Sequence, residues 1–259
     1  MRLGFGVDIG GTGIKAAPVD LDTGSLAAER VRVPTPPGAP PEAVCAVVGQ
    51  LVAAAGWTGP VGVAFPAVVQ HGIALTAANV DRRWIGTDVG EAVSAVTGTP
   101  TTVLNDADAA GLAEMRHGAG HGVTGVVVVL TLGTGIGSGL FSDGRLVPNT
   151  EFGHLEIDGY DAETRASESA REREGLTRAE WARRLEHYLR RLDALLWPDL
   201  VVLGGGGSKK AEQWIPLLDV RPALAAATLR NAAGIVGAAI AHDEALRGET
   251  RASSHDSGP

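Results

Sequence analysis

The sequence predicts an α/β fold built from two similar halves. Apolar runs of strand length alternate with longer runs of helix length along the 259 residues, a pattern typical of α/β proteins. The peptide Gly-Thr-Gly-Ile occurs at residues 11–14 and again at 133–136, each time directly after an apolar run. In both copies a second strand and then a tighter turn follow, at residues 22–24 and 142–144. Two matching glycine-rich hairpins, almost half a chain apart, indicate a duplicated half-fold with a cleft between the halves.

Each predicted element of the first half has a local reason. Apolar or alternating runs of strand length predict strands at residues 3–9, 15–21, 61–65 and 101–104. Runs rich in Ala and Val predict helices at residues 42–55, 89–96 and 107–117. The proline-rich segment 33–41 is predicted to be a loop, and Pro66 ends the third strand.

The second half follows the same logic. β-Branched residues predict a buried strand at residues 126–132, and a shorter apolar run predicts a strand at 200–203. Leucines at helical spacing predict an amphipathic helix at 176–196, and small residues predict a final helix at 232–246. The polar segment 158–173 is expected to be rich in loops. The tail at 249–259 is expected to be disordered.

Composition limits the classes of function. The formal net charge of −8 argues against a general binder of nucleic acids or membrane surfaces. Cys45 is the only cysteine, which excludes a disulfide framework and a zinc site built from several cysteines. No signal peptide and no apolar run of about 20 residues is present. We therefore expect a soluble, cytoplasmic protein with no nucleic-acid or membrane partner.

The glycine-rich loops are candidate phosphate sites. The first joins two strands, so it lacks the helix N-terminus of a dinucleotide fingerprint, and no Walker motif is present. Glycines in a hairpin still let backbone N–H groups approach phosphate oxygens, and two such hairpins are typical of a kinase-like site for one phosphate-bearing ligand. The alternative is a plain hairpin turn. The candidate ligands are Gly10, Gly11, Thr12, Gly13, Thr131, Gly133, Thr134 and Gly135.

Two charged residues flank the first hairpin loop. Asp8 stands near the end of the first strand, where a carboxylate could hold Mg²⁺ directly or through water. Lys15 follows the loop and is a candidate counter-charge for phosphate.

Asn105 and Asp106 stand where a predicted strand gives way to a helix. Transfer of a phosphoryl group to a sugar hydroxyl needs a base that removes the hydroxyl proton, and a carboxylate at a strand end suits that role. Asp and Asn are also favoured helix N-caps, and a purely structural role is the alternative.

The segment 151–156 contains Glu151, His154 and Glu156. These side chains can bind sugar hydroxyls or a metal ion, although no second His or Cys cluster lies nearby in the sequence. The alternative is an ordinary surface loop.

Residues 204–207 are four consecutive glycines that follow an apolar strand. Such a loop lets a flat ring or a phosphate approach the backbone, and Gly205, Gly206 and Lys209 are candidate donor ligands. The alternative is a flexible turn with solvated lysines.

The ordered set of motifs resembles the ROK family of sugar kinases, from about residue 3 to about residue 247. Within the family, the resemblance is strongest to the bacterial glucokinases that use polyphosphate. One such motif alone is weak evidence, whereas the whole set in this order is specific. The matching segments are residues 8–15, 76–81, 104–110, 131–137, 148–151, 153–156 and 208–210.

The resemblance implies an actin-like (ribonuclease H-like) two-domain fold with the active site in the interdomain cleft. It implies phosphoryl transfer to the 6-hydroxyl of glucose with Mg²⁺. By the family pattern Asp106 is the general base and Asn105 holds sugar hydroxyls beside it. The glucose ligands that it implies are Asn79, Asn105, Asp106, Glu151, His154 and Glu163.

The chain also departs from the family pattern. Many members carry a cysteine-rich zinc motif after the histidine, but this chain has no cysteine there, so no zinc is expected and His154 should bind sugar alone. Ala67 stands where the subgroup has glycine, close to the sugar pocket. Gly207 stands where the subgroup has valine, and it should loosen the loop before Lys209. Repressor members begin with a helix-turn-helix, whereas this chain starts with the first strand, which argues against DNA binding.

The sequence alone does not decide which compound donates the phosphoryl group. Long polyphosphate should prefer a basic groove, whereas ATP would need an adenine pocket, which the family places near residues 204–207. The resemblance favours polyphosphate, with ATP as a second donor. The competing interpretations are an ATP-dependent glucokinase or hexokinase that also accepts mannose or another hexose, and a non-catalytic sugar sensor. The candidate basic residues are Arg82, Arg83, Arg145, Lys209 and Lys210.

The resemblance also implies where the domains divide. The expected small domain comprises residues 1–105 with about 231–248, and the expected large domain comprises residues 106–230. Family members tend to form homodimers. The apolar face of the helix at 176–196 could be an interface or part of the core.

Overall fold

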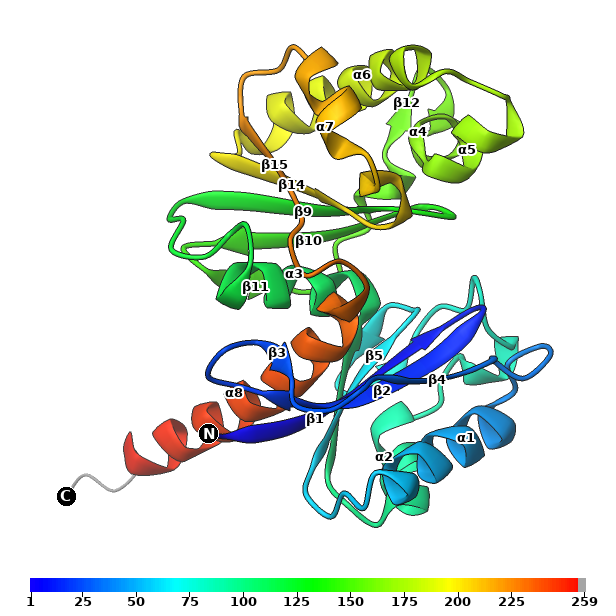
Figure 1. Ribbon diagram of the computed structural model, residues 1–259, viewed down its shortest axis with the longest axis vertical. Coiled ribbons are helices and arrows are strands. Elements are labelled where there is room, and N and C mark those ends of the chain that lie inside the picture. The colour runs from blue at the N-terminus through cyan, green and yellow to red at the C-terminus, as the bar shows by residue number, and fades with distance from the viewer. Residues whose placement is uncertain (256–259) are drawn as a thin grey trace. The chain divides into compact units, whose positions relative to one another are not determined.

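The computed structural model describes residues 1–255, with side chains described up to residue 245 (Figure 1). The chain forms two compact units. The first contains Met1–Ala109 and the C-terminal segment from Ala232, and the second is Ala110–Asn231. The chain therefore passes between the units at residues 109/110 and 231/232, close to the expected domain boundaries after residues 105 and 230.

The sheet of the first unit is ordered β3-β2-β1-β5-β8, and β4 also pairs with β2. Its strands are β1 (Leu3–Gly10), β2 (Gly13–Asp20), β3 (Ser25–Leu26), β4 (Val31–Val33), β5 (Val61–Phe65) and β8 (Thr101–Asn105). β1 and β2 form an antiparallel hairpin, whereas β5 runs parallel to β1 and β8 runs parallel to β5. The strands predicted at residues 3–9, 15–21, 61–65 and 101–104 are confirmed.

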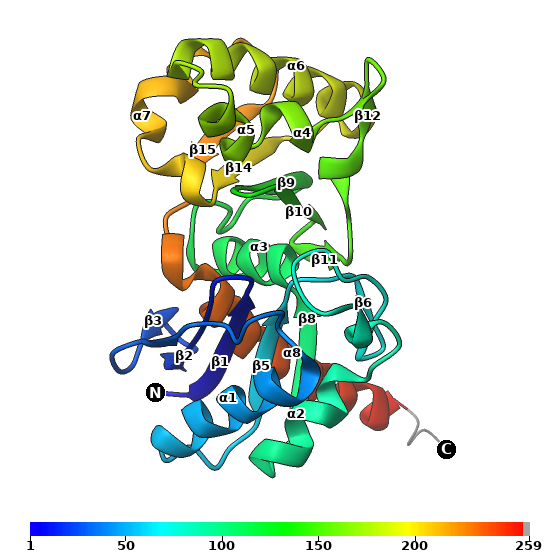
Figure 2. The same cartoon turned by 90° about the vertical axis from the view of Figure 1, so that its right-hand side faces the viewer.

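Helices cover both faces of this sheet (Figures 1 and 2). Successive side chains of a strand point to opposite faces. Val7 and Val63 join the core formed with α1 (Pro41–Ala54) and α2 (Val89–Thr97). Gly6 and Gly62 turn the other way, where any side chain would overlap backbone carbonyls of α8 (Ala233–His255). Glycine at these two positions lets the backbone of α8 lie directly on the sheet.

The sheet of the second unit repeats this topology in the order β11-β10-β9-β14-β15. Its strands are β9 (Val126–Leu132), β10 (Ile136–Ser142), β11 (Arg145–Val147), β14 (Leu200–Gly204) and β15 (Ala223–Ala226). β9 and β10 form the hairpin, β14 runs parallel to β9, and β15 runs parallel to β14. The duplicated half-fold predicted from the two glycine-rich hairpins is therefore confirmed.

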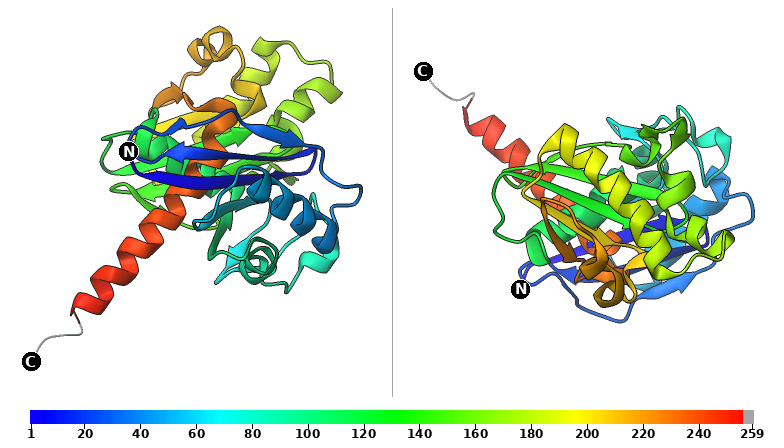
Figure 3. Two further views of the ribbon diagram at one scale, coloured as in Figure 1. Left: turned by 60° about the horizontal axis from the view of Figure 1, so that its bottom comes forward. Right: turned by 90° about the horizontal axis from the view of Figure 1, so that it is seen from above.

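Helices also cover both faces of the second sheet (Figures 1 and 2), and the right-hand view of Figure 3 looks down on the helices over one of these faces. Val129 faces α3 (Asp106–His117), where Gly111 lets the helix approach Val129 and Phe141. On the opposite face Leu130 and Leu132 pack with the apolar side of α6 (Arg178–Leu196), which begins with a capping box between Thr177 and Glu180. The apolar face of α6 therefore belongs to the core.

Small elements complete the two units. They are β6 (Val69–Gln70), β7 (Ile73–Ala74), β12 (Glu156–Ile157), β13 (Tyr160–Asp161), α4 (Glu163–Ala166), α5 (Glu168–Arg173), α7 (Ala211–Trp214) and 3₁₀ turns η1 to η5 (Arg82–Trp84, Phe152–His154, Gly206–Ser208, Ile215–Leu217 and Arg230–Ala232).

The expectation that residues 158–173 are mostly loop was wrong. Ser167 caps α5, and the indole Nε1 of Trp181 donates to Ala166 O at 2.9 Å, which anchors α4.

The C-terminal helix is longer than predicted. α8 continues to His255, so the expectation of disorder from residue 249 was wrong for residues 249–255. Residues 249–255 are polar apart from Ala252, so they carry no apolar pattern from which a helix could be predicted. The predicted tail residues 256–259 lie outside the described residues. Across residues 1–255, no helix has the length and apolar character that crossing a bilayer requires.

Candidate active site

The first glycine-rich loop is a two-residue turn formed by Gly11 and Thr12. Gly10 and Gly13 face each other directly before and after it in the β1–β2 register. Asn79, a predicted sugar ligand, is exposed and lies beside this turn, because a Cβ on Gly11 would stand 3.5 Å from Asn79 Cβ. No hydrogen bond to the N–H groups of Gly11 or Thr12 is found within residues 1–255, so these donors can serve a ligand.

Arg32 is a second cation at this turn, and the sequence analysis missed it. Its Nη2 donates to Thr12 O at 2.9 Å, and its guanidinium covers Gly13. Arg32 lies in β4, which pairs with β2 so that Arg32 stands opposite Lys15. Only the sheet register reveals this position, because β4 has three residues and no strong sequence signal.

Asp8 and Lys15 form an ion pair. They face each other across β1 and β2, and Lys15 Nζ lies 2.7 Å from Asp8 Oδ2. Asp8 also packs against Gly234 in the first turn of α8, where a Cβ would come within 2.9 Å of its Cγ. The positive end of the helix dipole favours a carboxylate at this place. The predicted metal ligand and the predicted phosphate counter-charge are therefore partners of each other.

Asn105 is the N-cap of α3. Its Oδ1 accepts hydrogen bonds from Ala107 N at 2.8 Å and Asp108 N at 3.1 Å, and its Nδ2 donates to Ala67 O at 3.0 Å. Asp106 follows as the first helical residue and is partly exposed. Asn105, and not Asp106, therefore caps α3. Because these hydrogen bonds occupy most of the donors and acceptors of the Asn105 amide, the amide has little remaining capacity to bind sugar hydroxyls.

Ala67 is accommodated without backbone strain. Its side chain is buried, and its φ angle is not positive. The methyl group that distinguishes it from glycine therefore needs no special conformation.

The second glycine-rich loop differs from the first by one residue. Leu132 pairs with Ile136, which leaves three residues in the loop instead of two. Ser169 of α5 donates from its N–H to Gly133 O at 3.1 Å and from its hydroxyl to Thr134 O. The loop carbonyls are therefore held by α5. Within residues 1–255 no hydrogen bond to the N–H groups of Thr134 and Gly135 is found.

Glu163 connects the second hairpin to the other predicted sugar ligands of this unit. Its Oε2 accepts a hydrogen bond from Ile136 N at 3.0 Å. The same oxygen would lie 3.2 Å from a Cβ on Gly153, which is part of the turn that carries Glu151 and His154. The structure therefore brings the three predicted ligands Glu151, His154 and Glu163 together at one end of the second sheet.

The three groups influence each other's ionisation. Partial desolvation by neighbouring atoms raises the pKa of Glu151, although its side chain remains exposed; His154 lowers this pKa and Glu163 raises it. The pKa of His154 is raised, mainly by its hydrogen bond with Asp161. Desolvation lowers this pKa, whereas the negative charges of Glu163 and Glu151 raise it further. His154 Nδ1 lies 3.2 Å from Asp161 Oδ2. Asp161 reaches His154 through the β12–β13 hairpin, and no local sequence pattern predicts this contact.

The loop after β14 packs against the second hairpin. Gly205 has a φ of 76°, and a Cβ there would come within 2.6 Å of Leu132 O, so glycine is required. Gly207 is buried against Leu132 and Trp181, and its carbonyl accepts a hydrogen bond from Trp214 Nε1 at 3.2 Å. Packing therefore fixes Gly207, which was expected to loosen the loop before Lys209.

The donor candidates of the second unit are neighbours. Thr131 stands beside Gly204 in the sheet, between the hairpin loop and the glycine loop. Lys209 is exposed and makes no ion pair within the described residues. Together, Thr131, the hairpin loop, Gly205, Gly206 and Lys209 can present N–H groups and positive charge to a phosphate.

The candidate basic residues differ in availability. Arg83 is engaged, because it pairs with Asp81 at 3.1 Å and with Glu42 at 3.2 Å. Four others are exposed and form no ion pair within residues 1–255: Arg82, Arg145, Lys209 and Lys210.

The residues present fit one kind of metal site. Within residues 1–255 no group of three or more His, Cys, Asp or Glu side chains could hold a metal ion. Asp8 offers a single carboxylate, which suits Mg²⁺, because proteins often bind this ion through one carboxylate and the phosphates of a substrate.

Each unit carries a glycine-rich hairpin on equivalent strands of a similar sheet. In the second unit, carboxylates and a histidine lie near the hairpin. Over residues 4–175 the chain matches the model of the ROK family. The chain belongs to the ROK family. Its α/β fold is the actin-like two-domain fold of ROK sugar kinases, as the sequence predicted.

Relatives with high identity cover almost the whole chain. A polyphosphate glucokinase of Mycobacterium tuberculosis is 51% identical over 241 residues, which are 93% of this chain and 91% of the relative. The crystal structure of an inorganic polyphosphate/ATP-glucomannokinase from Arthrobacter sp. strain KM is 52% identical, with a TM-score of 0.88, and covers 95% of this chain and 100% of that one. A ROK family glucokinase from Streptomyces griseus, in complex with glucose and AMPPNP, is 28% identical, with a TM-score of 0.76 over 93% of this chain and 99% of that one.

Proposed function

We propose that this protein is a polyphosphate glucokinase, which transfers a phosphoryl group from inorganic polyphosphate to the 6-hydroxyl of glucose. The observation that carries the proposal is the 51% identity to a polyphosphate glucokinase across 93% of the chain. The inorganic polyphosphate/ATP-glucomannokinase of Arthrobacter matches the fold as well, with a TM-score of 0.88.

The proposal gives each sugar ligand a chemical role. Asp106 removes the proton of the attacking hydroxyl as the phosphoryl group arrives. Carboxylates and an imidazole hold the remaining hydroxyls by hydrogen bonds, and their cluster in the second unit supports this assignment. The proposed glucose ligands are Asn79, Asn105, Asp106, Glu151, His154 and Glu163, of which Asn105 has the least remaining hydrogen-bonding capacity.

The phosphoryl donor is proposed to bind at the two glycine-rich hairpins and at the glycine loop after β14. Backbone N–H groups fixed before the reaction stabilise the charge of the transferred group. Mg²⁺, near Asp8, would neutralise donor phosphates. Zinc has no proposed role, because the chain has no cysteine near His154. The proposed donor ligands are Asp8, Gly10, Gly11, Thr12, Gly13, Lys15, Thr131, Gly133, Thr134, Gly135, Gly205, Gly206 and Lys209.

Replacing the proposed base tests the mechanism. Asp106→Asn keeps the size of the side chain but removes the proton acceptor, so kcat should fall by roughly 10²–10⁴-fold while glucose still binds. Calorimetric titration with glucose and a turnover assay measure the two effects. Glu91→Gln changes an exposed carboxylate of α2, a helix that carries no proposed ligand, and should behave as the unmodified protein. Near-normal turnover by Asp106→Asn would disprove the assignment of the base.

ATP is the competing or second donor. The Arthrobacter enzyme is named for both donors and for glucose and mannose, and the Streptomyces griseus enzyme was crystallised with AMPPNP. Turnover with each donor, and with mannose in place of glucose, separates a polyphosphate glucokinase from an ATP-dependent hexokinase. A homodimeric state and a cytoplasmic location complete the proposal; light scattering and cell fractionation test them.

A further inference from the structure

Arg32 completes a row of charged side chains across three neighbouring strands of the first unit. Asp8 in β1 stands opposite Lys15 in β2, and Lys15 stands opposite Arg32 in β4. Residues directly opposite each other in antiparallel strands place their side chains on the same face of the sheet. Within residues 1–255 β4 pairs with no strand other than β2, so the row ends at Arg32.

The charges of this row do not cancel. Lys15 is directed toward Asp8, with Nζ 2.7 Å from Oδ2, and the two side chains neutralise each other. Arg32 is exposed and forms no ion pair among the described side chains. Of the two cations Lys15 and Arg32, it is therefore Arg32 that offers an uncompensated charge to an anion.

Arg32 is held at the first glycine-rich loop by the loop itself. Its Nη2 donates to Thr12 O at 2.9 Å, and a Cβ on Gly13 would come within 2.7 Å of its Nε and Cζ. A guanidinium group has five N–H donors, so this contact leaves donors for a further acceptor. A side chain that is already held loses less conformational freedom when a ligand binds.

The same segment occupies a second carbonyl group of the loop. Thr35, three residues after Arg32, donates from its hydroxyl to Gly10 O. The N–H groups of Gly11 and Thr12, in contrast, have no hydrogen-bond partner within residues 1–255. The loop therefore offers donors to a ligand beside a fixed positive charge, which is the arrangement that an anion requires.

The second glycine-rich loop lacks this charge in the equivalent contacts. There Ser169 binds Gly133 O and Thr134 O through its N–H and its hydroxyl, which are both neutral. The two hairpins thus differ in the chemistry that holds their carbonyl groups, and the first uses a cation for this purpose.

We propose that Arg32 is a ligand of the phosphoryl donor, and that it binds a phosphate group of the donor together with the N–H groups of Gly11 and Thr12. The inference rests on the proposed function, because it adds a residue to the proposed donor site. A guanidinium group suits this role, since its fork of N–H donors matches two oxygens of one phosphate and its charge does not depend on pH.

Calorimetric titration with tripolyphosphate tests the proposal, with Mg²⁺ present and glucose left out so that no sugar acceptor is available. Arg32→Gln replaces the charge with a neutral amide, and binding should weaken about tenfold. Arg32→Lys keeps the charge and should retain most of the binding.

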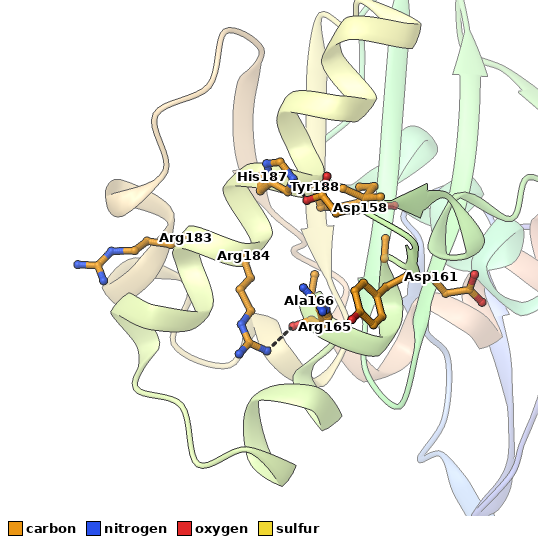
Figure 4. Close-up of a pocket in the computed structure, with 11 residues that line it drawn as sticks. Asp158, Asp161, Arg165, Ala166, Arg183, Arg184, His187 and Tyr188 are labelled. Atoms are coloured by element: carbon orange, nitrogen blue, oxygen red, sulfur yellow. Dashed lines mark hydrogen bonds and ion pairs between the residues drawn. The ribbon is translucent and has the colours of Figure 1, made fainter.

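Arg183→Ala is the matched control. It removes an exposed cation from α6, a helix that carries no proposed ligand. Arg183 forms no ion pair among the described side chains, and Figure 4 shows it pointing away from the other labelled residues. This variant should bind tripolyphosphate as the unmodified protein does.

A purely structural role of Arg32 gives a different result. If Arg32 only held Thr12 O, Arg32→Gln and Arg32→Lys would behave alike, because both keep an N–H donor, and salt would not change the effect. The proposal predicts that the loss in Arg32→Gln shrinks as salt screens the charge, while the affinity for glucose stays the same. In turnover assays the KM for the donor should rise more than kcat falls.

The outcomes separate this inference from the proposed function. Unchanged binding of tripolyphosphate by Arg32→Gln, equal losses in both Arg32 variants at every salt concentration, or no binding by the unmodified protein would overturn the role of Arg32. If tripolyphosphate bound through Arg32 but no glucose 6-phosphate formed, the proposed function would fail and Arg32 would remain a phosphate ligand.

Discussion

The contact between His154 and Asp161 decides how the imidazole can act. A carboxylate at Nδ1 favours the tautomer with the proton on Nδ1, which leaves Nε2 for a substrate hydroxyl. It also raises the pKa of His154, so the protonated form, in which Nε2 donates, persists to higher pH. Asp161 therefore has a positioning role for a proposed glucose ligand.

Asp161→Asn should change the pH dependence of stability. A histidine whose pKa is raised on folding contributes stability that is complete below its unfolded pKa of about 6.5 and is lost as pH rises through the folded pKa. The variant removes the largest cause of the shift. Its melting temperature should therefore fall below that of the unmodified protein at about pH 5.5 and approach it at about pH 8.5.

A double variant supplies the control for this prediction. In a His154→Gln background, Asp161→Asn should have no pH-dependent effect, because the titrating partner is absent. A difference in melting temperature that is equal at both pH values would contradict the account of the pair.

Several residues of the candidate site can be proposed from local sequence, and others cannot. Glu151 and His154 belong to one short motif, and both Asn105 and Asp106 carry a visible strand-to-helix signal. Arg32 and Asp161 lie in very short strands and reach the site only through sheet register or a small hairpin. Local sequence also could not decide which of Asn105 and Asp106 caps α3, because both are good caps.

At the scale of elements, the same peptide forms two different turns. Gly-Thr-Gly-Ile closes a two-residue turn in the first hairpin and a three-residue loop in the second. Ser169 of α5 binds carbonyls of the second loop, and Glu163 binds the N–H of Ile136 directly after it, whereas Arg32 of β4 binds the carbonyl of Thr12 in the first. Contacts from distant elements thus set the register, which explains why the repeat predicted the hairpins but not their geometry.

Close packing between α8 and the first sheet should make Gly6 intolerant of a side chain. Gly6→Ala would place a methyl group on the carbonyl of Ile235, so the free energy of unfolding should fall by about 2 kcal/mol or more. Urea denaturation measures this loss. In the same strand, a Cβ on Gly4 would meet the flexible end of Leu21 at 3.0 Å, so Gly4→Ala should cost less. Equal stability of the two variants would contradict the packing argument.

Glu114 secures the end of α3 to the chain that returns toward the first unit. Its buried carboxylate accepts hydrogen bonds from Ala119 N at 2.9 Å, Thr228 N at 3.1 Å and Leu229 N at 2.8 Å. The residue is 1% exposed. One carboxylate therefore satisfies backbone donors from two segments that are far apart in sequence.

Glu114→Gln should destabilise the second unit. The amide presents N–H groups where the backbone needs an acceptor, so the free energy of unfolding should fall by about 2–3 kcal/mol. Thermal and urea denaturation measure the change, and Glu212→Gln, at an exposed side chain of α7, is the matched control. An unchanged midpoint would show that the buried carboxylate is not needed for stability.

Elements with strong periodicity were predicted well, and short ones were not. The strand at 126–132 and the helix at 176–196 have long apolar patterns, and both agree closely with β9 and α6. The segment 158–173 has no such pattern, because its short helices are stabilised by capping and by an indole contact rather than by an apolar stripe. The extension of α8 has no apolar stripe either, so residues 249–255 carry no helical pattern and were expected to be a disordered tail.

For the whole molecule, duplication explains the arrangement of functional groups. Each unit carries one glycine-rich hairpin on the same two strands of an equivalent sheet. The copies have diverged: the first has Asp8, Lys15 and Arg32 around its loop, and the second has Glu163 and the glycine loop after β14. The sequence repeat predicted this architecture because both copies keep their glycines.

The net charge of −8 bears on the choice of donor. A chain of this charge repels long polyphosphate overall, so binding needs a local group of cations. Lys209 and Lys210 are exposed, follow the glycine loop and form no ion pair among the described side chains, and they are the proposed source of that charge. Arg145 pairs with Ser142 at the opposite end of the second sheet from the glycine-rich loop, so it does not belong to this group. Polyphosphate turnover should therefore weaken as salt concentration rises.

The central claim is tested most directly by measuring glucose 6-phosphate formation by the purified protein, with glucose and Mg²⁺, and long-chain polyphosphate or ATP supplied in parallel. The account predicts strong activity with polyphosphate, with or without a second activity with ATP. Activity with ATP alone would contradict the assignment of the donor, and activity with neither would contradict the proposed function.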